Sequence, residues 1–381
     1  MKIIHLRDQY LRVSFVYFLL KGFRKYEHWV ACREIITRDL KLYPYGKIIK
    51  TSRLFSFTWL LDKFLTVKMK FKARPVNDWV AYYQLLKEEA DILVLHAHMG
   101  PQGYYAIPLA EKLKKNLFVT FYGSDMSDVP KLPGWDERYH TLFHKAARII
   151  VEGEFMKGKI VELGCPAHKV AVVRIGIPLG DIPFSYRKRP VGGEPLRILM
   201  CANFYPKKGF LRALEAFRIM LGKGFSFQAQ IVGSGPQEQQ MKEYVNANGL
   251  ASRVTFLGSR TLPQIYQLSQ NMHLFFHPSE TAPDGGSEGG APTIILEMQA
   301  LGLPVIATTH ADIPHIIPEA NHFLAAEYDA KGLVQQFERL LAMDDWNALS
   351  DRGLKFVTEY HSNIACAARL EELYAQYNKT S

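Results

Sequence analysis

Residues 277–308 combine glycines, carboxylates and a helix start in a pattern that suits phosphate binding. The segment reads as the end of an apolar strand, then a glycine-rich loop, then a helix. In an open α/β sheet, ligands bind at the carboxyl ends of strands, and the free N–H groups and positive dipole of a following helix favour phosphate. Pro292 suits the first helical turn, because its missing N–H costs nothing there. The residues expected to bind the ligand at this helix start are Gly290, Ala291, Pro292 and Thr293.

Three charged side chains complete this pattern. Glu288 lies in the loop and Glu297 lies two turns into the helix, so both could accept hydrogen bonds from hydroxyls of a bound sugar and of a ribose. Lys208 lies in the turn NFYPKKG after another apolar run, where an ammonium would stabilise the charge of a leaving diphosphate. The alternative for each is a solvated surface side chain, the common state of glutamate and lysine.

Short apolar runs alternate with helical patterns from residue 92 onward, which predicts parallel strands covered by helices. A stretch rich in charge, Pro and Gly breaks the pattern, and a second α/β unit begins after it at LRILMCA. We therefore expect two Rossmann-like domains of the α/β class. The predicted divisions are an N-terminal domain at 1–185, a linker at 186–195, a C-terminal domain at 196–360, and a final helix at 361–381 that could cross back onto the first domain.

The composition fits a two-domain globular protein. The chain has 381 residues, 48% of them hydrophobic, and no segment reads as a membrane span or a secretory signal, so we expect a cytosolic protein. The four cysteines are scattered without a CxxC pair, which predicts free thiols. The net charge of +10 is concentrated in residues 1–75, which hold 17 basic and 5 acidic side chains. That region is expected to meet an anionic partner.

The C-terminal motifs resemble those of the retaining glycosyltransferases of family 4, whose GT-B fold has two Rossmann-like domains facing each other across a cleft. EGGAPTIILEMQALGLPVIAT resembles the family string EGxPxxxxEAMAxGxPVV, with one extra residue between Glu288 and Glu297. CANFYPKKG resembles GRLxxxKG, with Asn203 at the Arg position and Lys208 at the Lys position. The resemblance implies that Glu288 holds the transferred sugar, Glu297 the ribose and Lys208 the diphosphate. Further donor contacts implied by these strings, by GSGP and by TFLG are Gly209, Gly233, Gly235, Leu257 and Gly258.

The N-terminal domain carries matches on the acceptor side. VTFYGSD at 119–125 resembles the family string VTFHGxD, with Tyr122 in place of the histidine that lies against the transferred sugar. A phenol could donate a hydrogen bond there, but it would not titrate near neutral pH. The alternatives are that Tyr122 is a strand-end aromatic and that Asp125 forms an Asx turn. Other acceptor-side candidates are Gly123, Asp125, His98 in HAHMGPQG, and Ser14, which stands where polysaccharide-assembling relatives often have serine.

His96 and His98 alternate along a strand, so we expect only one of them to face the ligand, and we favour His98 because it is nearer the strand end. No third metal ligand is visible beside them, and GT-B enzymes generally need none. We therefore predict neither a metal site nor a cofactor.

Residues 53–74, RLFSFTWLLDKFLTVKMKFKAR, have the composition of a helix that lies in a membrane interface. Clustered Lys and Arg near an anionic leaflet contribute about 1 kcal/mol each, so the segment predicts peripheral binding to the inner face of the cytoplasmic membrane. The alternative is an ordinary amphipathic helix buried on one side. Nucleic acid is not an expected partner, because no recognised binding signature is present.

Taken with the resemblance, these features predict a retaining hexosyltransferase that uses a UDP- or GDP-linked sugar and a lipid-linked saccharide acceptor in surface polysaccharide biosynthesis. Retention and polysaccharide assembly are implied by the resemblance alone. Two alternatives stay open: transfer to a soluble sugar or sugar phosphate, and a non-catalytic member of the fold that binds a nucleotide or a polysaccharide.

Overall fold

The computed structural model describes residues 1–10, 19–35, 48–50 and 78–377. The chain forms two compact units. The first unit comprises Met1–Gly176 together with Asn363–Ser381, and the second unit is Ile177–Ser362. Ser14 and residues 53–74, for which acceptor and membrane roles are predicted, lie outside the described residues.

The first unit is built on a parallel sheet whose described strands follow the order β3-β2-β1-β4-β5-β6-β7. The strands are β1 (Lys2–Tyr10), β2 (Glu27–Ile35), β3 (Ile48–Lys50), β4 (Ile92–His98), β5 (Asn116–Thr120), β6 (Arg148–Val151) and β7 (Val170–Val172). The helices are α3 (Asp78–Leu86), α4 (Gly100–Leu113), α5 (Gly123–Ser127), α6 (Trp135–Lys145), α7 (Glu154–Glu162) and α14 (Asn363–Gln376). Every residue of β4 is buried, as expected for a parallel strand covered on both faces.

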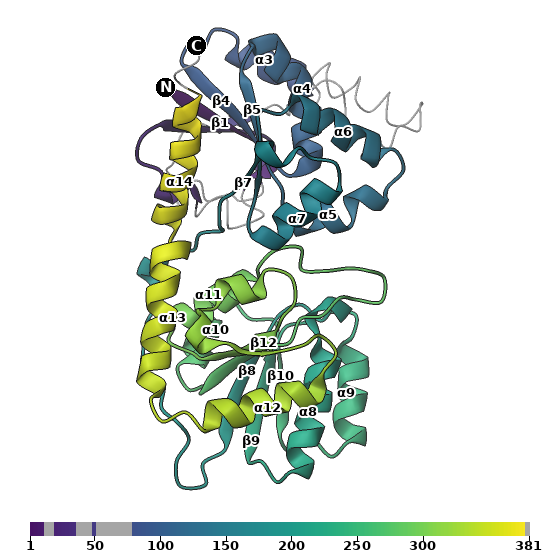
Figure 1. The fold of residues 1–381 in the computed structure, drawn as a ribbon, viewed down its shortest axis with the longest axis vertical. Coiled ribbons are helices and arrows are strands. Elements are labelled where there is room, and N and C mark those ends of the chain that lie inside the picture. Colours follow the sequence, from purple (N-terminus) through teal and green to yellow (C-terminus); the bar gives the residue numbers. More distant parts are fainter. Residues whose placement is uncertain (11–18, 36–47, 51–77, 378–381) are drawn as a thin grey trace. The chain divides into compact units, whose positions relative to one another are not determined.

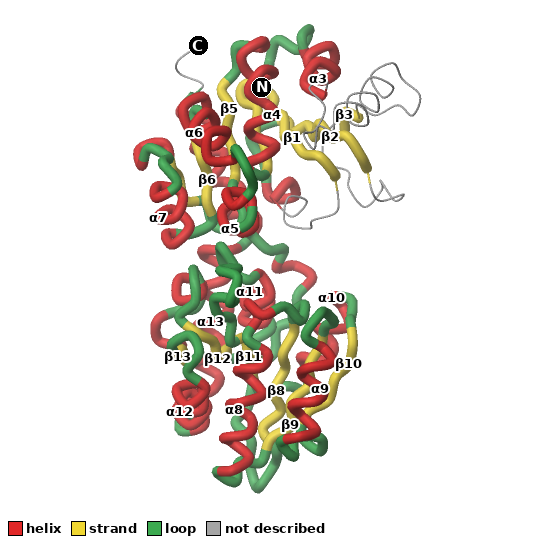
Figure 2. Tube along the Cα trace, turned by 90° about the vertical axis from the view of Figure 1, so that its right-hand side faces the viewer, coloured by secondary structure: helices red, strands yellow, loops and turns green. Residues whose placement is uncertain are grey.

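The second unit repeats this design, and its described strands run in the order β10-β9-β8-β11-β12-β13 (Figure 2). They are β8 (Leu196–Cys201), β9 (Phe227–Val232), β10 (Val254–Gly258), β11 (Leu274–His277), β12 (Val305–Thr308) and β13 (Phe323–Ala325). The helices are α8 (Phe210–Gly222), α9 (Glu238–Ala247), α10 (Leu262–Ser269), α11 (Thr293–Ala300), α12 (Ala330–Leu341) and α13 (Trp346–His361). Chain order reverses between the neighbours β8 and β11, and such a switch point is where open α/β sheets bind ligands.

The last helix, α14, packs onto the first unit, on which the sequence suggested it could fold back (Figure 1). Leu370 and Tyr374 are at most 1% exposed. They join a core cluster with residues of β1, β2, β4, β5 and β6. The first-unit core is therefore completed by the end of the chain.

The boundary between the units differs from the predicted linker at 186–195. The structure places residues 177–195 in the second unit. The Arg187 guanidinium is buried there and donates to the carbonyl oxygens of Gln270, at 2.9 Å, and Leu301, at 2.8 Å. A buried guanidinium with backbone partners anchors this stretch, although its Pro and Gly content is typical of a linker.

Candidate active site

Two loops of the second unit meet at the carboxyl ends of β8 and β11. The first follows β8 and ends in a 3-10 turn, Pro206–Lys208, and the second connects β11 to α11. The Lys208 Nζ lies 2.7 Å and 2.6 Å from the two carboxylate oxygens of Glu288. The Lys207 Nζ donates to the Ser287 carbonyl oxygen at 2.9 Å. Two of the predicted site residues, Lys208 and Glu288, are thus in direct contact although far apart in sequence.

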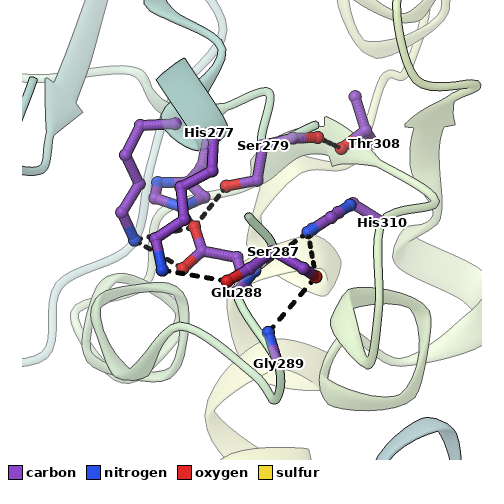
Figure 3. A network of polar contacts seen from close by, with 9 residues as sticks. His277, Ser279, Ser287, Glu288, Gly289, Thr308 and His310 are labelled. Atoms are coloured by element: carbon purple, nitrogen blue, oxygen red, sulfur yellow. Dashed lines mark hydrogen bonds and ion pairs between the residues drawn. The ribbon is translucent and has the colours of Figure 1, made fainter. Parts of the chain in front are cut away.

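The Glu288 carboxylate is a buried anion with a full set of partners (Figure 3). Its Oε1 accepts a hydrogen bond from the Ser279 hydroxyl at 2.6 Å and lies 3.6 Å from His277 Nε2. Burial raises the pKa of Glu288, but Lys208 and His277 outweigh burial, so this pKa is well below its usual range. Burial lowers the pKa of His277, and Glu288 opposes that shift. Glu288 is therefore ionised at neutral pH and can accept hydrogen bonds from hydroxyl groups.

His310 holds the backbone on which Glu288 sits, a role that the sequence analysis missed. Its Nδ1 lies 2.8 Å from Glu327 Oε1, and its Nε2 accepts the Glu288 N–H at 3.1 Å. Because the Nε2 accepts, the proton is on Nδ1 and is donated to Glu327. The same Nε2 lies 3.1 Å from the Ser287 hydroxyl, as Figure 3 shows. The only local signal in the sequence is that HPS at 277–279 and His310 each lie at or just after the end of a strand. Glu327, the other partner of His310, follows a third strand and gives no such signal.

Backbone packing requires glycine at three of the predicted donor positions. Gly209 has a φ of 65°, and a Cβ there would lie 1.8 Å from the Pro278 carbonyl oxygen. Gly233 has a φ of 144°, and its Cβ would lie 1.9 Å from the Ala202 carbonyl oxygen. Gly235 is closed in the same way by the backbone of Phe204, at 2.7 Å. These residues let the loops after β8, β9 and β11 pass close to one another, so their identity is explained without a ligand.

The other donor-side candidates occupy the same end of the sheet. Helix α11 begins at Thr293, so Pro292 occupies the N-cap position rather than the first helical turn. Glu297 is 7% exposed, and burial raises its pKa to about 7. Asn203 is exposed, and its carbonyl oxygen accepts the Tyr205 N–H at 2.9 Å. The remaining candidates line the neighbouring loops: Gly290 and Ala291 precede α11, and Leu257 and Gly258 end β10.

In the first unit, the Asp125 side chain connects two loops through hydrogen bonds. Its carboxylate is fully buried and accepts the backbone N–H groups of Gly100, at 2.9 Å, and Tyr122, at 3.2 Å. Burial raises the pKa of Asp125 to about 7, against these two hydrogen bonds. Gly123 begins α5 directly after Tyr122. These two hydrogen bonds orient the loop that carries Tyr122, and contact of Asp125 with the acceptor stays a prediction.

Tyr122 and His98 are in contact, and the expectation that alternation along the strand lets only one of His96 and His98 face the ligand is wrong in its premise, because residues two positions apart in a strand point to the same face and these two rings stack with centroids 4.4 Å apart. The His98 Nδ1 lies 2.8 Å from the Tyr122 hydroxyl, and His96 is buried beside it. A third histidine, His5 on β1, lies beside them: one ring nitrogen from each of His5, His96 and His98 can be chosen so that all three lie within 4.8 Å of one another. The sequence analysis found no third ligand because β1 pairs with β4 across a long stretch of chain.

Two further expectations concern side-chain chemistry and membrane spans. The four cysteines are free thiols, as predicted. Among the described residues, no helix combines the length and the apolar character that crossing a membrane requires.

Comparison with known proteins identifies the family. The family description "Glycosyl transferases group 1" matches residues 195–343, which contain Lys208, Glu288 and Glu297. The chain is 34% identical to the amylovoran biosynthesis glycosyltransferase AmsK of Erwinia amylovora over 281 residues, 72% of this chain and 68% of the relative. The chain belongs to the group 1 glycosyl transferases.

A second relative of this group 1 chain is the putative colanic acid biosynthesis glycosyltransferase WcaL of Escherichia coli strain K12. It is 30% identical over 258 residues, and the match covers 67% of this chain and 62% of the relative. The fold is also similar to the crystal structure of Anabaena Alr3699/HepE in complex with UDP. The superposition covers 99% of this chain and 100% of the Anabaena chain, with a TM-score of 0.76 at 14% sequence identity. The predicted GT-B fold is confirmed by this likeness and by similar ones.

Proposed function

We propose that this group 1 protein transfers a sugar from a nucleotide diphosphate sugar during the biosynthesis of a surface polysaccharide. The observation that carries the proposal is the contact between Lys208 and Glu288, which joins the loop after β8 to the loop before α11 at the switch point of the sheet. The names of the two relatives, both polysaccharide biosynthesis glycosyltransferases, support the pathway. The UDP in the Anabaena structure supports the donor class.

In this proposal the diphosphate displaces Glu288 as the partner of Lys208. The ammonium then stabilises the negative charge that grows on the diphosphate as the glycosidic bond breaks. Lys207 is a second cation in the same turn, and it compensates for Asn203 at the position where the family has arginine. The free N–H groups that begin α11 favour the same phosphates.

The carboxylates act on hydroxyl groups of the donor. Glu288, released from Lys208 but still held by Ser279, accepts hydrogen bonds from the transferred sugar. Glu297 accepts hydrogen bonds from the ribose. These bonds are strongest when Glu297 is ionised, and because its pKa is raised to about 7 the ionised form predominates only above neutral pH. Assignment to family 4 and retention of configuration rest on the motif resemblance, and NMR of the product anomer tests retention. We propose no metal, so turnover in excess EDTA should equal turnover without it.

Donor binding is tested by thermal stabilisation. UDP or GDP at one hundred times its Kd should stabilise the protein by about 2.7 kcal/mol. Lys208→Ala should weaken this stabilisation, whereas Lys223→Ala, which removes an exposed lysine paired with Glu338, should leave it unchanged. If neither nucleotide raises the melting temperature of the wild-type chain, the proposed function is wrong.

For the acceptor, we propose a saccharide linked to a lipid in the cytoplasmic membrane, reached by an enzyme that binds the inner face of that membrane. The support is the basic, aromatic composition of residues 53–74. Sedimentation with anionic liposomes measures the binding, and charge reversal of Lys68, Lys70 and Lys72 should abolish both the binding and transfer to a lipid-linked acceptor. If the wild-type chain does not sediment with liposomes but transfers the sugar to a soluble sugar, the acceptor is soluble.

A further inference from the structure

Four buried histidines connect Tyr122 to the C-terminal helix inside the first unit. His28, His5, and His96 with His98 lie on the neighbouring strands β2, β1 and β4, and each is at most 7% exposed. The His98 Nε2 lies 2.9 Å from His5 Nδ1, and the His5 Nε2 lies 2.8 Å from His28 Nδ1. We call His98, His5 and His28 the imidazole chain.

The two ends of the imidazole chain are a phenol and a carboxylate. At one end the Tyr122 hydroxyl lies 2.8 Å from His98 Nδ1. At the other end His28 Nε2 lies 3.9 Å from Glu371 Oε1 on α14. The Glu371 carboxylate is 2% exposed and accepts the backbone N–H groups of Arg24, at 2.9 Å, and Lys25, at 2.6 Å. Glu371 is therefore held in place at the His28 end of the imidazole chain.

The three imidazoles are neutral at neutral pH. Burial lowers the pKa of His28 to about 3. Burial, with smaller contributions from the neighbouring histidines, lowers the pKa of His5 and the pKa of His98 well below the usual value, and Arg7 adds to the shift of His98. A neutral imidazole has one N–H donor and one acceptor nitrogen. Consecutive hydrogen bonds along the chain must therefore all point the same way, either toward Glu371 or away from it.

Glu371 selects between the two directions. If the bonds point away from it, the bare His28 Nε2 lone pair faces a carboxylate oxygen, and two acceptors repel each other in a buried, weakly screened place. If the bonds point toward Glu371, the His28 Nε2–H faces that oxygen and is attracted. The second arrangement puts a proton on the Nε2 of every imidazole in the chain, and it requires the Tyr122 hydroxyl to donate to His98.

A second connection from α14 reaches the same place. Tyr374, one turn after Glu371, has its hydroxyl 2.6 Å from His96 Nδ1, and the His96 Nε2 lies 2.7 Å from the Thr120 hydroxyl. Thr120 and Tyr122 both line a small cavity of about 30 Å³, together with Glu152 and Arg174. A cavity of this size has room for a water molecule or a hydroxyl group. Helix α14 is thus connected through the histidines to Thr120 and to Tyr122, two of the polar residues that line the cavity.

A metal ion fits this cluster less well than the hydrogen bonds do. His5, His96 and His98 each offer one ring nitrogen, and these three nitrogens lie within 4.8 Å of one another. However, the rings of His96 and His98 are stacked, with centroids 4.4 Å apart and planes at 30°, so their in-plane lone pairs run side by side instead of converging. The positive charge of Arg7 also acts on His98, and the three-histidine group contains no carboxylate to balance a cation.

We propose that Glu371 fixes, through the imidazole chain, the direction of the Tyr122 hydroxyl: its proton points to His98, and its oxygen accepts a hydrogen bond from a hydroxyl of the bound saccharide. Glu371 and the imidazole chain are positioning residues, and Tyr122 is the group that contacts the ligand. The saccharide in this inference rests on the proposed function, whereas the direction of the hydroxyl does not. A phenol could in principle donate to the ligand, but in this proposal the Tyr122 hydroxyl donates to His98 and accepts from the ligand.

The direction is tested by NMR of the full chain with ¹⁵N-labelled histidine at neutral pH. The expected spectrum shows His5, His28 and His98 as neutral rings protonated at Nε2. Glu371→Gln supplies an amide that can donate to His28 Nε2, so His98 should become partly protonated at Nδ1. The matched control is Glu372→Gln, which removes an exposed carboxylate from the same helix and should change nothing.

Three spectroscopic outcomes would overturn the proposal. They are His98 protonated at Nδ1 in the wild-type chain, no response of His98 to Glu371→Gln, and binding of one equivalent of Zn²⁺ that shifts His5, His96 and His98 together. None of them depends on catalytic activity, so they separate this inference from the proposed function.

The consequence for the reaction is tested by hydrolysis of UDP-glucose and GDP-mannose. Glu371→Gln should lower the kcat of donor hydrolysis about tenfold, the value of one misdirected hydrogen bond, with the donor KM unchanged. Tyr122→Phe should lower the kcat as much, and the double variant should be no worse than either single variant. An unchanged kcat in a Glu371→Gln protein whose His98 has changed tautomer contradicts the role of Tyr122. Absence of hydrolysis by the wild-type chain counts against the proposed function and leaves the tautomer result to decide the direction.

Discussion

Replacing Lys208 by methionine should destabilise the second unit because it leaves the Glu288 carboxylate buried without its cation. The carboxylate side chain is 7% exposed and the lysine 18%. Removing one partner of a buried ion pair costs about 3–5 kcal/mol of folding stability. Because the lysine is partly exposed, we expect a loss at the lower end of this range, about 3 kcal/mol. For a domain of this size, that loss lowers the melting temperature by about 6–12 °C.

The loss should depend on pH in a definite direction. In the wild-type chain the pKa of Glu288 is depressed, so its contribution to stability is present above the usual pKa of 4.5 and disappears as the pH falls through the folded-state value. Without Lys208, burial dominates and raises this pKa, so the variant is relieved by protonation as the pH falls. The deficit of Lys208→Met relative to the wild type is therefore larger at pH 8 than at pH 5.

A double-mutant cycle separates this interaction from general damage. Glu288→Gln alone should cost about 1 kcal/mol, because the flexible ammonium can reach solvent and the amide still accepts from Ser279. The double variant should recover about 2 kcal/mol relative to the sum of the single losses. The melting transition of the second unit, followed by calorimetry at both pH values, gives the three differences. Additive losses, or a Lys208→Met loss under about 0.5 kcal/mol, would refute the buried-pair argument.

Three further predictions concern other parts of the second unit. Burial raises the pKa of Glu297 from 4.5 to about 7, so ionisation of Glu297 destabilises the fold as the pH rises through this window. Glu297→Gln should therefore be more stable than the wild type by up to about 3 kcal/mol at pH 8 and by little at pH 5. Melting temperatures at the two pH values measure the difference. Gly209→Ala, at a φ of 65° and against a carbonyl oxygen, should cost more than about 2 kcal/mol in urea unfolding, whereas Gly222→Ala, at the open end of the same helix, should gain about 0.5 kcal/mol. His310→Ala should weaken UDP binding in calorimetric titration by loosening the loop, and the exposed His315→Ala should not; equal effects of both would contradict the positioning role.

The sequence was sufficient for the order of elements in the second unit and for placing Lys208 and Glu288 at the same edge of the sheet, although not for their ion pair. Both follow from strings in which a strand, a turn and a helix are adjacent in the chain, and the carboxyl ends of parallel strands meet at one edge of the sheet. The sequence was insufficient for His310 and for His5. Each reaches its partners across strands whose pairing depends on the whole sheet, and neither lies in a recognisable local motif.

Local composition also misplaced a boundary. Pro, Gly and charged residues are typical of linkers, but a single arginine can anchor such a stretch when backbone carbonyl groups are within its reach. Arg187 does this through two carbonyl oxygens, which no propensity argument anticipates. The glycines at 209, 233 and 235 were predicted from motifs that imply donor contacts. The proximity of neighbouring loops alone explains why glycine occupies these positions.

The placement of α14 has a consequence for how the protein is made. The first unit is discontinuous, because its last helix is encoded after the whole of the continuous second unit. The core of the first unit therefore cannot be completed until the whole of the second unit has been synthesised, because Leu370 and Tyr374 follow it in the chain. Until then the places of these two side chains in the first-unit core are unfilled, and a chaperone that shields exposed apolar surface would act on the nascent first unit.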